Sequence, residues 1–167
     1  YLASPLNLLF ILSPEQFLRE AFALMILLKI GAAGAFCAWS LQLISGKRLY
    51  GSVIFASFYA LCGWALGYYW NIMWLDTFAM FPLVAAGLMA LIRDKKYKLY
   101  TVSLAASILV QYYMGLLVCI FLAACFLALC LLWKRNAGQF WENLKHMALF
   151  SGIAALAGAV VILPTVE

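Results

Sequence analysis

Two ionisable residues lie in apolar stretches of the sequence, where a charged side chain is costly unless a partner or a polar cavity compensates for it. Lys29 lies in the run Leu27–Gly31, and Asp76 closes the run Trp70-Asn71-Ile72-Met73-Trp74-Leu75-Asp76. At the centre of a bilayer a charged side chain costs about 2.5–3.5 kcal/mol even on the lenient insertion scale. We therefore expect Lys29 to pair with an acid, to face a polar cavity or to snorkel outward. In a cavity it would hold the phosphate or carboxylate of a ligand.

Asp76 admits two interpretations. An acid at the start of a helix caps free N–H groups and favours the helix dipole, and we expect the next helix to begin at Thr77. An acid that faces an outer cavity can instead act as a general base, a metal ligand or a hydroxyl acceptor. Asn71 lies five residues earlier and would share such a site.

A third polar group, Gln111-Tyr112-Tyr113, interrupts another apolar run. Paired tyrosines are common at membrane interfaces, but these hydroxyls and the amide also suit sugar or phosphate oxygens. The sequence has no GxSxG, P-loop or HExxH motif, and its five cysteines and one histidine form no metal-ligand pattern. We identify no cofactor and no metal site, and leave a divalent-metal requirement open.

The composition says what kind of solvent surrounds these residues. Hydrophobic residues make up 68% of the 167 residues and charged residues 10%, whereas ordinary globular domains are roughly 45–50% apolar and about 25% charged. Mean hydropathy is +1.03. The net charge of +5 comes from basic clusters between apolar runs. This pattern is typical of cytoplasmic loops, and it argues against nucleic-acid binding.

Three basic clusters predict the membrane topology of the chain: Lys47-Arg48, Arg93–Lys98, and Lys134-Arg135 with Lys145 beyond. Short basic loops stay in the cytoplasm, so each segment between them must cross twice. As single helices, residues 49–92 and 99–133 would measure about 66 Å and about 52 Å, too long for one crossing. We place the outward turns at 70–76 and 111–115.

The predicted fold is all-α: one multispanning transmembrane domain, residues 1–167, of about six spans arranged as helical hairpins. A small-residue zone at 31–35 would admit a close neighbouring helix. Residues 6–12 would form a short apolar helix, which is interfacial, re-entrant or the end of a helix that begins before residue 1. The spans are expected at about 18–44, 50–70, 77–92, 99–113, 115–133 and 148–163, with an interfacial helix at about 137–146.

Several of these segments resemble the bacterial YfhO membrane protein family. The most specific is the run Asn71-Ile72-Met73-Trp74-Leu75-Asp76. The others are Tyr1–Asn7, Leu28–Gly31, Tyr59–Trp64, Gln111–Gly115 and Leu163–Thr165. Their order and spacing match along essentially the whole chain.

The resemblance implies a bacterial multi-pass protein of the cytoplasmic membrane with a GT-C-like fold. Such a glycosyltransferase moves a sugar from a polyprenyl-phosphate carrier to a cell-wall polymer such as lipoteichoic acid, on the outer face. Its partners would be membrane lipid, this donor, this acceptor and the rest of a longer chain. The main acid is expected upstream of Tyr1, so that the 167 residues alone would be inactive. Asp76 would then be catalytic, and Lys29, Asn71, Gln111, Tyr112 and Tyr113 would bind substrate.

Two other functions remain open from the sequence. A transporter or flippase for a lipid-linked or anionic substrate would use Lys29 and a broken helix near Gly115. A purely structural module would scaffold partners in wall assembly. An acidic loop upstream would favour the enzyme, and an inverted repeat would favour the transporter.

Overall fold

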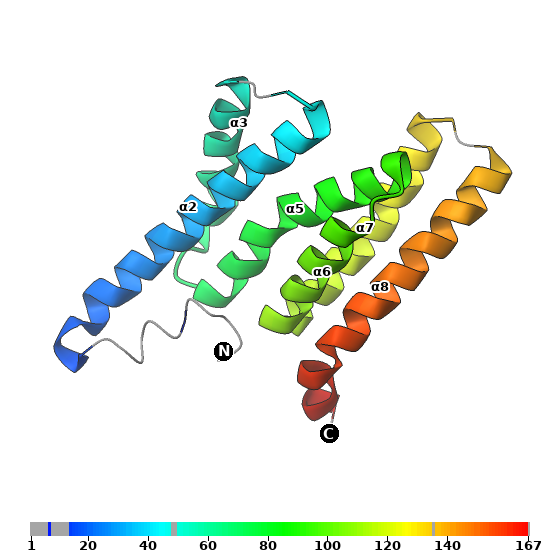
Figure 1. Cartoon of the computed structure of the whole chain (residues 1–167). Helices are drawn as coiled ribbons and strands as arrows, with labels where there is room; N and C mark the ends of the chain where they lie inside the picture. The colour runs from blue at the N-terminus through cyan, green and yellow to red at the C-terminus, as the bar shows by residue number, and fades with distance from the viewer. Residues whose placement is uncertain (1–6, 8–13, 48–49, 135, 167) are drawn as a thin grey trace.

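The computed structural model describes residues 7, 14–47, 50–134 and 136–166, and every regular element in them is helical. The predicted all-α bundle is confirmed (Figure 1). After a 3₁₀ turn, η2 (Glu15–Phe17), the helices are α2 (Leu18–Ser45), α3 (Tyr50–Ala60), α4 (Gly63–Gly67), α5 (Ile72–Asp94), α6 (Lys98–Val110), α7 (Tyr112–Leu132) and α8 (Ala137–Val166).

Within the described residues, four segments are long and apolar enough to cross a membrane: Leu18–Ser45, Tyr50–Gly67, Ile72–Asp94 and Tyr112–Leu132. The second of these joins α3 and α4. The apolar helix α6 is shorter, because its 13 residues at a rise of 1.5 Å span only about 20 Å of a hydrocarbon core about 30 Å thick.

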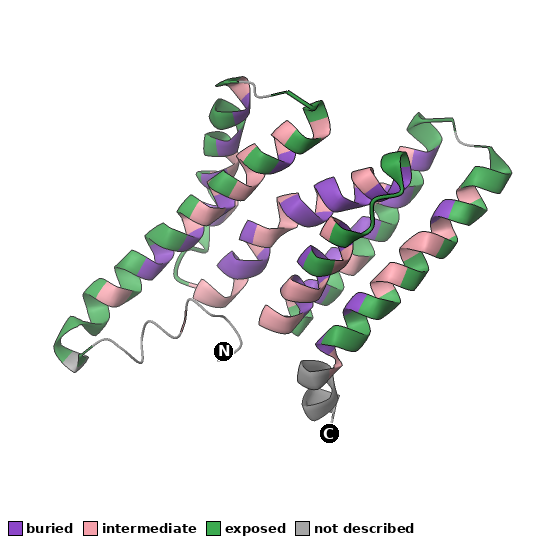
Figure 2. Cartoon of the chain, viewed as in Figure 1, coloured by how far each residue is buried: buried purple, intermediate pink, exposed green. Residues whose placement is uncertain are grey.

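Helix α5 is the centre of the bundle. In its most apolar part 67% of the residues are buried, compared with at most 28% in the other candidate spans. Figure 1 shows α2 and α3 on one side of α5, whereas α6, α7 and α8 lie on its other side. Figure 2 shows that α5 carries much of the buried surface. The main core lies on the second side and is built from α5 to α8. Its members are Val84, Leu88, Leu91, Ile92, Tyr100, Leu104, Ile108, Val118, Leu122, Phe126, Cys130 and Ala154.

Small residues let the helices approach closely. A Cβ on Gly87 of α5 would lie 2.6 Å from Tyr100 Cα of α6, and one on Gly115 of α7 would lie 3.0 Å from Ile108 Cα. In the predicted small-residue zone, a Cβ on Gly34 would lie 3.4 Å from Ala60 Cβ of α3. Such close packing is typical of membrane helices, whose association gains no hydrophobic driving force in lipid.

Large apolar side chains cover the outside of the bundle. Examples are Leu27 of α2, Phe55 of α3 and Leu131 of α7, which are 68%, 69% and 78% exposed. Water would penalise such a surface, whereas lipid does not. The exterior thus agrees with the composition.

The described residues of the basic clusters lie at one end of the bundle. Arg93 Nη1 donates to the Ile44 carbonyl at 3.2 Å, which ties the end of α5 to the end of α2. Lys95 Nζ donates to Asn143 Oδ1 at 2.7 Å and pairs with Glu142 at 3.0 Å, which ties the next loop to α8. The α7–α8 connection lies at the same end (Figure 1).

Three boundaries differ from those expected. Helix α5 begins at Ile72 rather than at Thr77, and Gln111 alone separates α6 from α7. A single helix, α8, replaces the separate interfacial helix at 137–146 and last span at 148–163, because no residue between them breaks the backbone hydrogen bonding. The short helix expected at residues 6–12 falls, apart from Asn7, outside the described residues.

Candidate functional site

Lys29 and Asp76 form a buried ion pair. Lys29 Nζ lies 2.7 Å from Asp76 Oδ2, and the two side chains are 1% and 9% exposed. The pair joins α2 to α5 across 47 positions of sequence. Of the three fates expected for Lys29, pairing with an acid is the one that the structure adopts, and burial excludes snorkelling.

Every ammonium proton of Lys29 has an acceptor. Besides Asp76, Nζ donates to Asn7 Oδ1 and to the Ile72 carbonyl, both at 3.1 Å. A lysine has three N–H donors, so its donor capacity is filled. A ligand phosphate would have to displace one of these acceptors before it could bind Lys29 directly.

The start of α5 determines where Asp76 points. Because the helix begins at Ile72, Asp76 is its fifth residue and not an N-cap. Asn71 occupies the N-cap position, but its side chain makes no capping hydrogen bond. The capping interpretation of Asp76 is therefore wrong: its carboxylate faces α2, one turn inside the helix. About 27 Å, or 18 residues at 1.5 Å each, separates Asp76 from the basic end at Asp94.

Aromatic rings surround the turn that precedes α5. We call this group the aromatic cluster. Its rings pair at centroid distances from 4.5 Å, for Tyr59 and Phe78, to 6.5 Å, for Tyr68 and Trp70. The members are Tyr59, Trp64, Tyr68, Trp70, Trp74 and Phe78. Tryptophan and tyrosine gather where a membrane meets water, so the cluster is suited to the interface opposite the basic end.

A proline sets one further contact. Pro82 lies inside α5 and has no N–H to donate to the carbonyl of Phe78. Tyr59 Oη of α3 donates to this carbonyl at 2.7 Å, and the ring of Tyr59 stacks on that of Phe78. A side chain from α3 thus satisfies the acceptor that Pro82 leaves free.

An open apolar groove of about 300 Å³ lies against the first half of α5. Thr77, the neighbour of Asp76, lines it, and the Thr77 hydroxyl is buried without a hydrogen-bond partner in the described part of the chain. The other lining residues are Tyr59, Trp64, Phe78, Phe81, Met114 and Val118. The groove is thus suited to an apolar chain, with the Thr77 hydroxyl in its wall.

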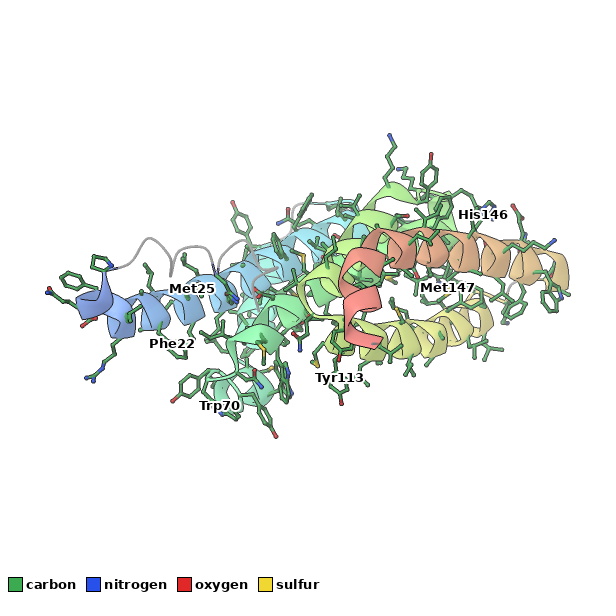
Figure 3. The ribbon with its side chains drawn as sticks, turned by 90° about the horizontal axis from the view of Figure 1, so that it is seen from below. Phe22, Met25, Trp70, Tyr113, His146 and Met147 are labelled. Atoms are coloured by element: carbon green, nitrogen blue, oxygen red, sulfur yellow. The ribbon has the colours of Figure 1, made fainter. Side chains whose placement is uncertain are left out.

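The other predicted site residues lie around this region. Tyr112 and Tyr113 are about half exposed, and Gln111 is partly buried at the break between α6 and α7. Met114, the next residue along the chain, lines the groove. Seen from below, Tyr113 and Trp70 project on the same side of the bundle (Figure 3). No interaction described by the structure joins Gln111, Tyr112 or Tyr113 to Asp76.

The structure adds three features that the sequence did not reveal: Asn7 and the Ile72 carbonyl as acceptors for Lys29, and Thr77 in the wall of the groove. Only the rule that a buried ammonium needs three acceptors pointed to the first two. Among the described residues, no three His, Cys, Asp or Glu side chains converge on a point where a metal ion would sit.

The helical bundle, its apolar exterior and its buried ion pair define a multi-helix integral membrane protein. More specifically, the chain belongs to the family described as bacterial membrane protein YfhO, whose model matches residues 1–167. No curated protein and no solved structure matches it.

Proposed function

We propose that this chain is the membrane part of a glycosyltransferase that moves a sugar from a polyprenyl-phosphate carrier to a cell-wall polymer such as lipoteichoic acid. The observation that carries the proposal is a carboxylate, Asp76, buried beside an ammonium one helical turn from the end that bears the aromatic cluster. A charged pair at this depth is expensive, and in membrane proteins such residues mark functional sites.

In the proposed step, a hydroxyl oxygen of the acceptor polymer forms a bond to the anomeric carbon of the sugar. The bond from that carbon to the carrier phosphate oxygen breaks, and the polyprenyl phosphate leaves with the electron pair. Asp76 accepts the hydroxyl proton or orients the hydroxyl for a principal base elsewhere in a longer chain. Asn71 lies at the start of the same helix and is placed to orient the acceptor or the sugar.

In this scheme Lys29 positions the Asp76 carboxylate through their ion pair. Its hydrogen bond to Oδ2 fixes one carboxylate oxygen and so sets the orientation of the Asp76 side chain. Direct binding of the carrier phosphate by Lys29, the role expected from the sequence, requires Asn7 or Asp76 to leave.

The groove beside Thr77 supplies a place for the first isoprene units of the carrier. Its wall is almost wholly apolar and aromatic, and it includes Thr77, the residue that follows Asp76 in α5. Gln111, Tyr112 and Tyr113 directly precede Met114, which lines the groove, and in this scheme they contact the sugar or the carrier head.

The test is a transfer assay on the full-length protein with a panel of polyprenyl-phosphate sugars. Asp76→Asn is isosteric, and we expect it to reduce transfer by about 10²–10⁴-fold, the usual contribution of a general base. Asp94→Asn is the matched control, because Asp94 is an exposed acid at the other end of the same helix. Near-normal transfer by Asp76→Asn would remove Asp76 from the site.

A charge swap separates catalysis from support of the fold. The double variant Lys29→Asp with Asp76→Lys keeps the ion pair but exchanges its ends. We expect it to unfold near the original temperature and to lack transfer activity. A swapped protein that folds and transfers sugar normally would reduce the pair to a structural contact.

Lys29→Met distinguishes the two roles of the lysine. A positioning role predicts a lower kcat at unchanged KM, because the Asp76 carboxylate loses the hydrogen bond that orients it. A phosphate-binding role predicts a higher KM for the donor at unchanged kcat.

The transporter alternative predicts movement of labelled carrier lipid across vesicles without transfer. The break at Gln111 gives it little support, because α6 and α7 fold back on each other there: a Cβ on Gly115 would lie 3.0 Å from Ile108 Cα. Gln111 is therefore a hairpin turn rather than an unwound stretch within one crossing.

A further inference from the structure

A second groove lies at the basic end of the bundle, remote from Asp76. It measures about 220 Å³ and runs between the ends of α2 and α5 and the start of α6. Its walls are apolar: Leu43, Ile44, Ala86, Met89, Ala90 and Leu99. Arg93, Asp94 and Lys96 line it at and just after the end of α5, and Trp133 lines it at the end of α7.

The charge around this groove is strongly one-sided. By sequence, the three basic clusters and residues 136–147 hold nine basic and two acidic residues, a net charge of +7. The remainder of the chain holds two basic and four acidic residues, a net charge of −2. An anion is therefore attracted to this end and not to the other.

The two cationic side chains of the groove differ in the partners with which they already interact. Arg93 donates to the Ile44 carbonyl, one of the free carbonyls at the end of α2, and pairs with Asp94 at 3.1 Å. The Lys96 ammonium is exposed, and within the described residues its interaction is electrostatic attraction to Asp94, with no hydrogen bond or salt bridge. Its N–H donors can therefore bind an anion that enters beside Arg93.

We propose that this groove binds an anionic phospholipid, with one acyl chain along its apolar walls and the phosphate at Lys96 and Arg93. The arrangement fits the two ends of a lipid: the walls are nearly all carbon, and the cations stand at one end only. Basic pockets between helices at the cytoplasmic surface are a known form of headgroup site. Trp133 at the rim is of the residue type that favours the headgroup level. This site is independent of sugar transfer.

Native mass spectrometry of the complete chain tests the proposal. The probes are phosphatidylglycerol and phosphatidylcholine with identical acyl chains, and inorganic phosphate is a separate arm. We expect phosphatidylglycerol to remain bound in preference to phosphatidylcholine. We expect phosphate at millimolar concentration to leave this preference unchanged, because it lacks the chain.

Two variants locate the lipid. Lys96→Gln should weaken phosphatidylglycerol binding about fivefold, which corresponds to the loss of about 1 kcal/mol per surface lysine. Lys98→Gln is the control, because it removes the same charge two residues away, at the start of α6 and outside the groove lining. Ala90→Phe should remove binding of the chain by filling the groove.

Equal losses in Lys96→Gln and Lys98→Gln would overturn the proposal, since they would mean diffuse attraction to a basic surface. Equal binding of the two lipids would do the same, as would competition by inorganic phosphate. Ala90→Phe that folds and still retains phosphatidylglycerol would place the lipid elsewhere. Lys96→Gln is an exposed change and keeps the test valid if Ala90→Phe does not fold.

Discussion

Lys29 shows what a cation requires inside an apolar bundle. The ammonium is 1% exposed, so water cannot satisfy it, and three protein acceptors take its three protons. The charge of Asp76 offsets that of Lys29. Each partner makes the burial of the other tolerable, and neither is tolerable alone.

Removing one partner should therefore cost far more than removing both. We expect Asp76→Leu to lower the free energy of unfolding by about 3–5 kcal/mol, because it leaves a buried charge unpaired. Adding Lys29→Met should recover most of this loss. Chemical unfolding in detergent measures both. Additive losses in the double variant would show that the two residues do not depend on each other.

Tyr59 illustrates a neutral version of the same rule. Its hydroxyl satisfies the Phe78 carbonyl that Pro82 leaves free. Tyr59→Phe should cost about 1–3 kcal/mol, the usual penalty for a buried group without its hydrogen bond. Adding Pro82→Ala supplies an N–H for this carbonyl, so Tyr59→Phe should cost much less in that background. A double-mutant cycle with no coupling would contradict this account.

At the scale of elements, the close packing of α5 against α6 depends on a glycine, Gly87. Gly87 allows the backbone of α6 to come so close that an added Cβ would lie 2.7 Å from Tyr100 N. Backbone atoms cannot move aside as a flexible side chain can. The contact between α5 and α6 therefore tolerates only glycine at this position.

Gly87→Ala should destabilise the bundle by about 1–3 kcal/mol, the usual cost of overpacking. Gly31→Ala is the matched control, because Gly31 also lies in a membrane helix and has no atom within 4 Å of the added Cβ. Alanine favours a helix more than glycine does, so the control should be neutral or stabilising. Thermal unfolding of both variants in the same detergent measures the difference. Equal unfolding midpoints for the two variants would contradict the packing argument.

At the scale of the molecule, the two ends differ in chemistry. One end has the basic clusters, tied together by the contacts of Arg93 and Lys95. The other has the aromatic cluster and the ion pair. By the positive-inside rule, the basic end is expected in the cytoplasm, which would put Asp76 on the outer side.

Labelling of single cysteines in intact cells tests this orientation. In a background with the five native cysteines replaced, Tyr69→Cys should react with a membrane-impermeant maleimide from outside. Lys96→Cys should react only after the membrane is permeabilised. Both residues are exposed, so access to the reagent is not limited by packing. The reverse pattern would invert the proposed topology and place Asp76 on the cytoplasmic side.

Much of the fold was predictable because it depends on terms that act along the chain. The length of each apolar run, the three basic clusters and the polar breaks near Asn71 and Gln111 are local properties. They predicted helical hairpins with the basic loops at one end. Local terms were weaker at helix boundaries: Asp76, expected before a helix, lies inside one because the backbone hydrogen bonds of α5 begin five residues earlier.

The sequence by itself determined that the chain is a helical membrane protein and that Lys29 and Asp76 each need a partner or a polar environment. Only the tertiary structure decided that they are partners of each other, 47 positions apart. It also decided that Thr77 lines a groove and that Tyr59 satisfies a carbonyl freed by Pro82. These contacts depend on which faces of two helices meet, and close packing of whole helices sets those faces, not the residues on either side in the chain.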